Sequence, residues 1–168
     1  MGKEVYIGID PGLSGAIAAV DESGKVKFVD DLPTISSSKG KKELHLPEVA
    51  KIVSRLMSDT GLVFGAVEKV GARPGQGVVS MFRFGLATGQ MHGILTGMKI
   101  PIILVRPQVW QKEFLRYTDG PDNKAKSVLA ASYRFPDISL PRKKDHGKAE
   151  ALLIAEFCRK YHQGKLET

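Results

Sequence analysis

Residues 4–21, EVYIGIDPGLSGAIAAVD, give the strongest indication of how this chain folds. Its first seven residues alternate between apolar and other side chains, which predicts a β-strand that ends at Asp10. The following PGLSG has the composition of a tight turn, and residues 15–21 predict a second strand. A third strand is expected over 25–31 after a short polar connection, so the chain begins with three antiparallel strands.

The remainder of the chain alternates expected helices with two further strands. We expect, in chain order, a polar loop over 34–45, a helix over 46–57, a strand over 62–68, a Gly-rich loop over 69–79, a helix over 80–97, a strand over 101–107, and helices over 107–116, 122–134 and 147–161. Antiparallel strands joined to parallel ones through helical crossovers make a mixed sheet with helices on its faces. Because the sequence contains neither repeats nor a dividing linker, we expect residues 1–168 to form a single α/β domain.

The composition narrows the class of protein. A net charge of +7 and a pI near 9.5 suit a polyanionic partner such as nucleic acid, or an anionic membrane surface. No run approaches the roughly 18 to 20 apolar residues that cross a bilayer, and no signal or transit peptide is visible, which predicts an intracellular, soluble protein. The single cysteine, Cys158, excludes an internal disulfide and a cysteine-ligated zinc site.

The helix expected over 80–97 contains four glycines at a spacing of four, which places them in one row: Gly85, Gly89, Gly93 and Gly97. Each glycine costs a helix about 1 kcal/mol relative to alanine, so a closely packed partner must compensate. That partner could be the sheet, another helix or a second subunit.

Two acidic residues follow apolar strands in the same manner. Asp10 ends the first strand before a Pro-Gly turn, and Glu68 ends the strand over 62–68 before a Gly-rich loop. Taken alone, Asp10 is better explained as a turn residue that accepts backbone hydrogen bonds. Two acids at the ends of neighbouring strands repel each other unless a cation or a proton neutralises them. Such carboxylates suit Mg²⁺ or Mn²⁺.

A third acidic element, KDHGKAE over 144–150, opens the otherwise apolar last helix. Helix capping is the alternative explanation, with Asp145 or His146 before the first turn and Glu150 complementing the helix dipole. The combination of all three elements favours a metal site over three separate structural roles.

Other candidate residues carry weaker signals. The histidines show no paired spacing of the kind that metal ligands have: His45, His92, His146 and His162. Trp110 is expected in the core or at its rim rather than as a platform for a nucleobase. The apolar residues after the Gly-rich loop are expected in the core rather than on nucleic acid: Met81, Phe82 and Phe84.

The ordered set of acidic motifs resembles RuvC-type Holliday junction resolvases of the ribonuclease H-like superfamily. The motifs are GIDPGLSGA (8–16), AVE (66–68), and the pair Asp145 and Glu150, five residues apart. The resemblance runs over about residues 4–160 and is greatest to phage RuvC-like proteins and the chloroplast junction resolvase. It implies a ribonuclease H-like, mixed five-stranded sheet flanked by helices.

The resemblance also implies a four-ligand metal site. Two Mg²⁺ ions roughly 4 Å apart would activate water and stabilise the leaving oxygen, with Mn²⁺ as a substitute and no small-molecule cofactor. Asp10 would bridge both ions, Glu68 would hold one, and Asp145 with Glu150 the other. In bacterial RuvC the last two carboxylates are usually three residues apart. Here that position is Gly147, so His146 competes with Asp145 for the fourth place.

The implied partner is a four-way DNA junction, bound by a homodimer that cuts two strands symmetrically. We place the dimer interface on the glycine-row helix. The implied setting is a bacterial or phage-infected cytoplasm, or a chloroplast or mitochondrion after a transit peptide has been trimmed. Each candidate DNA contact has solvated surface charge or polarity as its alternative explanation, and the set is Arg73, Gln76, Arg83, Lys112, Lys124, Lys126, Arg142, Lys143, Lys144 and Lys148.

Three other functions compete with a junction resolvase. An actin-like ATPase or sugar kinase also begins with a strand-Asp-Gly turn, but it needs two such domains and a much longer chain. A ribonuclease H-like enzyme acting on RNA is closer, although such chains are generally shorter and lack the Asp145–Glu150 ending. A catalytically silent junction-binding protein would have no use for clustered acids facing phosphate.

Overall fold

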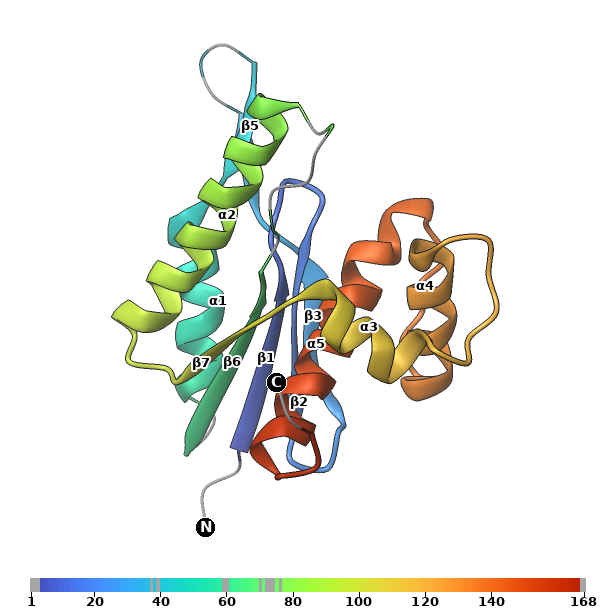
Figure 1. The fold of residues 1–168 in the computed structure, drawn as a ribbon. Coiled ribbons are helices and arrows are strands. Elements are labelled where there is room, and N and C mark those ends of the chain that lie inside the picture. The colour runs from blue at the N-terminus through green and yellow to red at the C-terminus, as the bar shows by residue number, and fades with distance from the viewer. Residues whose placement is uncertain are drawn as a thin grey trace.

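The computed structural model describes residues 4–36, 38, 40–58, 61–69, 71, 75 and 77–166. The strands are β1 (Glu4–Asp10), β2 (Ala16–Asp21), β3 (Val26–Asp31), β4 (Thr34–Ser36), β5 (Lys42–Leu44), β6 (Leu62–Glu68) and β7 (Ile102–Val105). The helices are α1 (Leu46–Ser58), α2 (Val78–Gly97), α3 (Pro107–Leu115), α4 (Asn123–Arg134), the short 3₁₀ turn η1 (Lys143–Asp145) and α5 (His146–His162). Figure 1 shows their arrangement.

The central sheet has the order β3-β2-β1-β6-β7. β1, β2 and β3 are antiparallel neighbours, whereas β6 runs parallel to β1 and β7 parallel to β6. This mixed sheet arises because a short turn can join antiparallel strands, while parallel strands need the crossovers that α1 and α2 provide. The expected α/β class and the five-stranded mixed sheet are confirmed.

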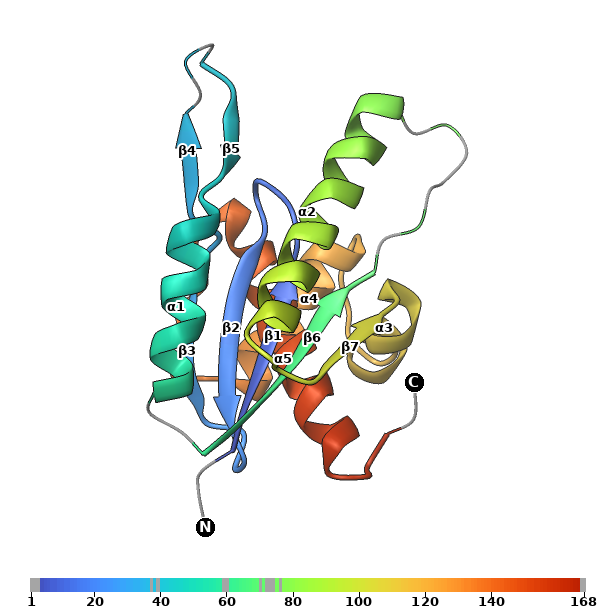
Figure 2. The ribbon, with the colours of Figure 1, turned by 90° about the vertical axis from the view of Figure 1, so that its left-hand side faces the viewer.

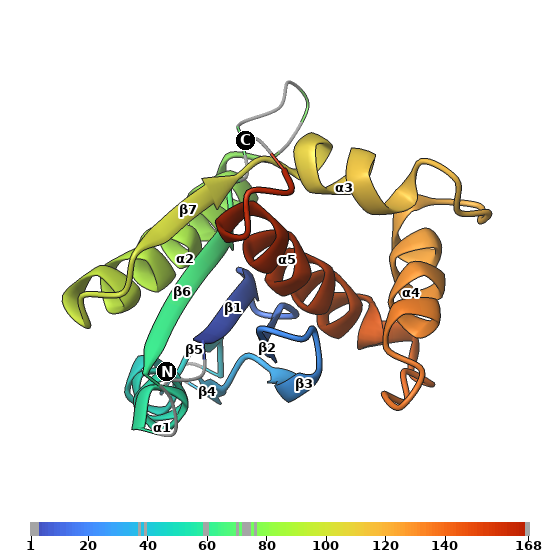
Figure 3. The ribbon, with the colours of Figure 1, turned by 90° about the horizontal axis from the view of Figure 1, so that it is seen from below.

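Helices cover both faces of the sheet (Figure 3). On one face, α1 and α2 pack their apolar sides against Ile7, Ile9 and Ile17. On the other face, α5 lies against the sheet, with α3 and α4 outside it. Since α5 contacts the sheet on one side and these two helices on the other, its side chains from Ala151 to Arg159 are all buried. An apolar helix of this kind is what the sequence predicted.

Residues 34–45, expected to be a loop, contain the short hairpin β4–β5. The hairpin projects from the molecule beside the N-terminal part of α2 (Figure 2). The sequence did not predict these strands because most of their side chains are polar and exposed on both faces, so the apolar alternation of a half-buried strand is missing. Among the described residues, no helix combines the length and the apolar character that crossing a membrane requires.

Candidate active site at the ends of β1 and β6

Asp10 and Glu68 lie side by side at one edge of the sheet. β1 and β6 are parallel neighbours, and Ile9 pairs with Val67, so each acid is the next residue of its strand. Both side chains are largely buried, with exposed fractions of 8% and 7%. The sequence-based expectation that these two acids meet depends on this neighbour relation, which the structure supplies.

Glu150 joins them because α5 crosses β1 at very short distance. A Cβ atom at Gly8 would lie 2.1 Å from the backbone nitrogen of Ala155, and one at Gly147 would lie 2.6 Å from the carbonyl oxygen of Ser14. These two glycines therefore let the first turn of α5 rest on the turn that follows Asp10. The Ser127 hydroxyl of α4 donates to the carboxylate of Glu150 at 3.4 Å.

The three carboxyl groups are electrostatically coupled. Burial, together with the charges of Glu150 and Glu68, raises the pKa of Asp10 well above its usual value. Burial and the charge of Glu68 raise the pKa of Glu150 to about 7. Lys124 acts in the opposite direction on both pKa values. The site therefore favours protonation or a bound cation, as expected for like charges in a partly buried place.

Asp145 does not reach this cluster. Its side chain is 1% exposed and accepts hydrogen bonds from the backbone nitrogen of Arg142 at 2.7 Å and from the Nε of Arg142 at 2.8 Å. The Arg142 guanidinium lowers the pKa of Asp145, which keeps it ionised in a structural ion pair. Asp145 precedes the first turn of α5, as the capping alternative expected, but its carboxylate caps the 3₁₀ turn η1 and makes no capping bond to α5.

His146, the competitor of Asp145, lines the groove that contains the three acids. Its Nδ1 lies 3.2 Å from the carbonyl oxygen of Lys143. A carbonyl oxygen only accepts hydrogen bonds, so Nδ1 is the donor in this contact.

Trp110 contacts the site in a way that the sequence analysis did not anticipate. Its side chain is fully buried, as expected for a core residue, yet its Nε1 donates a hydrogen bond of 2.8 Å to Oε1 of Glu68. α3 begins directly after β7, the neighbour of β6, and this places the indole beside Glu68. No motif in the sequence signals this contact, because 42 residues separate the two partners.

A groove of about 760 Å³ surrounds the acids. Its walls come from the turn after β1, the strand β5 and the first half of α2. Phe82, Arg83 and Phe84 face it, although Phe82 was expected in the core and is 70% exposed. Lys41, Lys42 and Lys124 add positive charge to its lining. An acidic floor with cationic walls can hold a metal ion and an anionic substrate together.

The predicted DNA contacts fall into distinct groups. Arg83 and Lys124 line the acidic groove; Lys124, Arg142 and Lys143 line an adjoining cavity of about 530 Å³. Lys112 lies in a third cavity, and Lys126 lies on α4 and lines none of the three. Arg73 and Gln76 lie outside the described residues.

Several of these cations are already paired within the chain. Lys144 binds Asp31 at 2.9 Å and Lys148 binds Asp30 at 2.9 Å. Arg142 is shared between Asp145 and Asp31. The ends of β3 therefore neutralise much of the basic segment before α5, which sequence reasoning could not foresee without knowing that β3 lies beside it.

Comparison with solved structures identifies the fold. The structure of Thermus thermophilus RuvC in complex with Holliday junction substrate superposes with a TM-score of 0.64, covering 96% of this chain and 94% of that chain at 16% sequence identity. The chain has the RuvC fold. A second Thermus thermophilus RuvC structure gives a TM-score of 0.60 with 21% identity, over 96% of this chain and 97% of that chain.

In addition to sharing the RuvC fold, the chain is similar in sequence to one junction resolvase. The chain is 34% identical over 98 residues to the chloroplastic Holliday junction resolvase MOC1 of Chlamydomonas reinhardtii. The match covers 57% of this chain and 11% of that protein, so the chain spans only a small part of its relative's length. No protein-family model matches the chain. The resemblance to RuvC-type resolvases that the acidic motifs indicated is confirmed.

Proposed function

We propose that this chain is a structure-selective endodeoxyribonuclease that resolves four-way DNA junctions by paired nicking in recombination, repair or the processing of branched DNA. One observation carries the proposal. Asp10, Glu68 and Glu150 converge at the carboxyl ends of two strands of a RuvC-fold sheet, inside a groove with cationic walls. The likeness in sequence to a junction resolvase supports the same substrate.

The donor chemistry of this cluster fits a divalent metal such as Mg²⁺. Three hard carboxylate ligands, two of them with raised pKa values, gain most from a cation that removes their mutual repulsion. Within the described part of the chain, no three His, Cys, Asp or Glu side chains are gathered closely enough to coordinate one ion as they stand. Asp10, Glu68 and Glu150 are the residues we assign to the metal, with two ions per site and Mn²⁺ as a substitute.

His146 is a better candidate than Asp145 for the fourth position. It lines the same groove as the three acids, whereas Asp145 is engaged by Arg142. When bound, the metal ions would supply Lewis acidity toward the scissile phosphate and the attacking water. His146 would hold the metal through Nε2, because its Nδ1 lies against the carbonyl oxygen of Lys143. Lys124 offsets the negative charge that the DNA strand brings into the groove.

Homodimerisation through α2 is the second part of the proposal. A Cβ atom at Gly85, Gly89 or Gly93 would meet nothing within 4 Å, so neither the sheet nor another helix of the described chain packs on this row. Large apolar side chains are exposed on the same helix: Val78, Val79, Phe82 and Leu86. Of the three partners that the glycine row allows, a second subunit is the one that remains. It would give two active sites related by two-fold symmetry, which a symmetric double cut requires.

The decisive test is cleavage of a synthetic four-way junction beside a linear duplex and an RNA duplex of matched sequence, each with and without Mg²⁺. We expect symmetric, ligatable nicks in the junction alone, dependent on Mg²⁺ and lost in Asp10→Asn. Junction binding without any cutting in Mg²⁺ or Mn²⁺ would instead favour a catalytically silent binding protein. Equal cutting of linear DNA or RNA would support a nuclease activity but contradict selectivity for four-way junctions.

The same assay separates the two candidates for the fourth position. His146→Ala should lower the cleavage rate by about 10-fold or more while the unfolding midpoint stays close to that of the parent, since single catalytic groups contribute at least this much. Asp145→Asn should lower the unfolding midpoint and leave the cleavage rate close to that of the parent, because it weakens the ion pair with Arg142 before α5. A large loss of rate in folded Asp145→Asn would return Asp145 to the metal site.

A further inference from the structure

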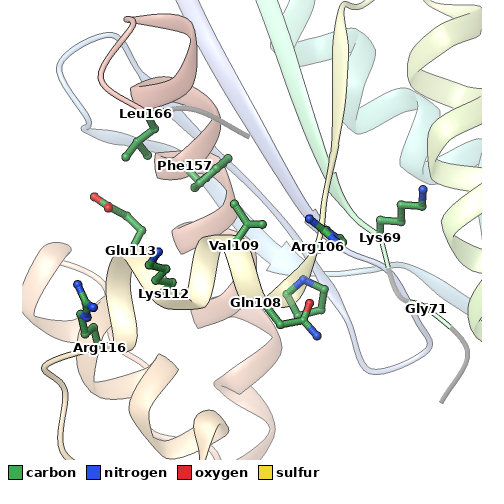
Figure 4. Close-up of a pocket in the computed structure, with 11 residues that line it drawn as sticks. Lys69, Gly71, Arg106, Gln108, Val109, Lys112, Glu113, Arg116, Phe157 and Leu166 are labelled. Carbon is green, nitrogen blue, oxygen red and sulfur yellow. The ribbon is translucent and has the colours of Figure 1, made fainter. Parts of the chain in front are cut away.

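A third cavity, of about 720 Å³, lies on the outer side of α3 and contains none of the three acids. Its lining comes from Lys69 and Gly71 after β6, from the start of α3, and from Phe157 and Leu166 in the C-terminal part of the chain. Figure 4 shows Lys112 and Arg116 projecting from α3, Lys69 and Arg106 from the segments beside it, and the apolar Val109 and Phe157 between them.

The charge inside this cavity is strongly positive. Four cationic side chains line it, namely Lys69, Arg106, Lys112 and Arg116. Its one acidic lining residue, Glu113, is bound by Lys160 at 2.6 Å. Across the described residues, no salt bridge neutralises any of the four cations, in contrast to Arg142, Lys144 and Lys148. Four cations without a salt bridge among the described residues therefore lie together in this cavity, whereas Arg142, Lys144 and Lys148 are paired.

The cavity is also connected to the acidic groove through the backbone. Lys69 follows Glu68 directly, and Lys69 donates its backbone N–H to the carbonyl oxygen of Val105 at 2.8 Å. α3 separates the two sites. Trp110 points from α3 to Glu68, while Lys112 and Arg116 line the opposite side. A polyanion lying across the end of β6 would reach both.

We infer that this cavity binds the sugar–phosphate backbone of a junction strand close to the position of the cut. The inference rests on the proposed function and extends it to residues that no motif singled out: Lys69, Arg106 and Arg116. Cations around an apolar floor of Val109, Phe157 and Leu166 match phosphates flanking a deoxyribose. A long, regularly charged strand uses several spaced cations, whereas a single small anion would need only one or two.

The test measures junction affinity without cleavage, in the Asp10→Asn background with Ca²⁺. The variant is Arg106→Gln/Arg116→Gln, and the matched control is Lys51→Gln/Arg55→Gln, which removes the same charge from α1 on the opposite face of the sheet. We expect the variant, and not the control, to bind at least about 10-fold more weakly. Its salt dependence should fall by roughly 1.4 to 1.8 in log K per log salt, at about 0.7 to 0.9 for each lost phosphate contact.

A second readout locates the contact. A series of junctions is made, each with one phosphate near the cut replaced by an uncharged methylphosphonate. At some of these positions the replacement should weaken junction binding by the control variant at least about threefold. At those positions the Arg106→Gln/Arg116→Gln variant should show no further loss, because the contact is already absent.

Two outcomes would overturn the inference. If the parent and control bind the junction while the variant keeps the same affinity and salt dependence, this cavity does not hold DNA and the proposed function stands. If the parent itself fails to bind the junction, the proposed function fails and the inference falls with it.

Discussion

Trp110 ties the core of the molecule to its acidic site through one hydrogen bond to Glu68. Trp110→Phe keeps the aromatic volume and removes the donor, so the carboxylate loses its fixed orientation. We expect a cleavage rate about 10-fold lower and a higher Mg²⁺ concentration at half-maximal rate, the usual effect of losing an outer-shell partner. Junction cleavage over a Mg²⁺ series measures both quantities.

Junction affinity in Ca²⁺ is the control for Trp110→Phe, and it should not change, because the indole is fully buried and touches no DNA. Equal losses of affinity and rate, together with a lower unfolding midpoint, would assign Trp110 to the core alone.

Glu150 makes the stability of the metal-free protein depend on pH. Its pKa is raised from 4.5 to about 7 in the folded state, so between these values the folded chain holds a proton that the unfolded chain has released. The stability contributed by protonated Glu150 is therefore present below pH 4.5 and is lost as pH rises through about 7. Denaturation midpoints in EDTA from pH 4.5 to 8 should show the fall, and Mg²⁺ should reverse much of it.

Glu150→Gln removes the titrating group without changing the shape of the side chain. The fall with pH should become shallower in this variant, with the remainder due to Asp10, whose pKa is also raised. A wild-type midpoint that is flat or rises over the same window would contradict the coupling of the three carboxyl groups.

At the level of elements, the crossing of α5 over β1 determines whether Glu150 reaches Asp10. Gly8→Ala places a Cβ atom against the backbone of Ala155, which cannot move without shifting the helix. We expect a loss of about 1–3 kcal/mol in the free energy of unfolding, typical of overpacking, and a larger loss of cleavage. Chemical denaturation and junction cleavage measure the two effects.

Gly93→Ala is the matched control for this substitution. A Cβ atom there meets nothing within 4 Å, so the same chemical change in a helix should stabilise the monomer by up to about 1 kcal/mol. Similar changes in both variants would mean that the close crossing at Gly8 is not what positions α5.

The elements themselves were largely predictable from local pattern. Alternation predicted β1, β2 and β3 within a residue, and helical spacing predicted α1 and α5. The hairpin β4–β5 was missed because its polar, exposed side chains carry no alternation. In α4 the buried residues are Ser127 and Ala131, and Val128 packs partly buried against the core. The direction in which a weakly amphipathic helix faces depends on its neighbours.

For the whole molecule, the exposed face of α2 predicts self-association. Gly85→Leu/Gly89→Leu should abolish close contact between two copies of α2 while leaving the monomer folded, since both glycines face open space and leucine favours helices. Sedimentation analysis over a concentration series should show a dimer in the wild type and a monomer in the variant. Symmetric paired nicking should give way to single nicks.

The control for this association experiment is Met57→Ala, a substitution at an exposed apolar residue of α1. It removes an exposed apolar side chain far from the glycine row and should not change association. A wild-type chain that stays monomeric at tens of micromolar would contradict the assignment of α2 as the interface.

The order of the elements, the acids that end β1 and β6, and the acidic start of α5 all follow from the amino-acid sequence. These features are local, because strand alternation, turn composition and helix periodicity depend on residues within a few positions of each other. The same local motifs were enough to indicate the RuvC resemblance. They also predicted a glycine row that needs a partner.

Which of these side chains lie close together in space depends on the tertiary structure. The carboxylate of Asp145 binds Arg142, whereas His146 lines the acidic groove, because successive residues at the start of a helix point in different directions. Lys144 and Lys148 bind Asp31 and Asp30 on β3, more than 100 positions earlier in the chain, while the cations of the cavity beside α3 have no salt bridge among the residues that the structure describes. Charge and hydrogen bonding act through space at distances of a few ångströms, and sequence separation does not reveal those distances.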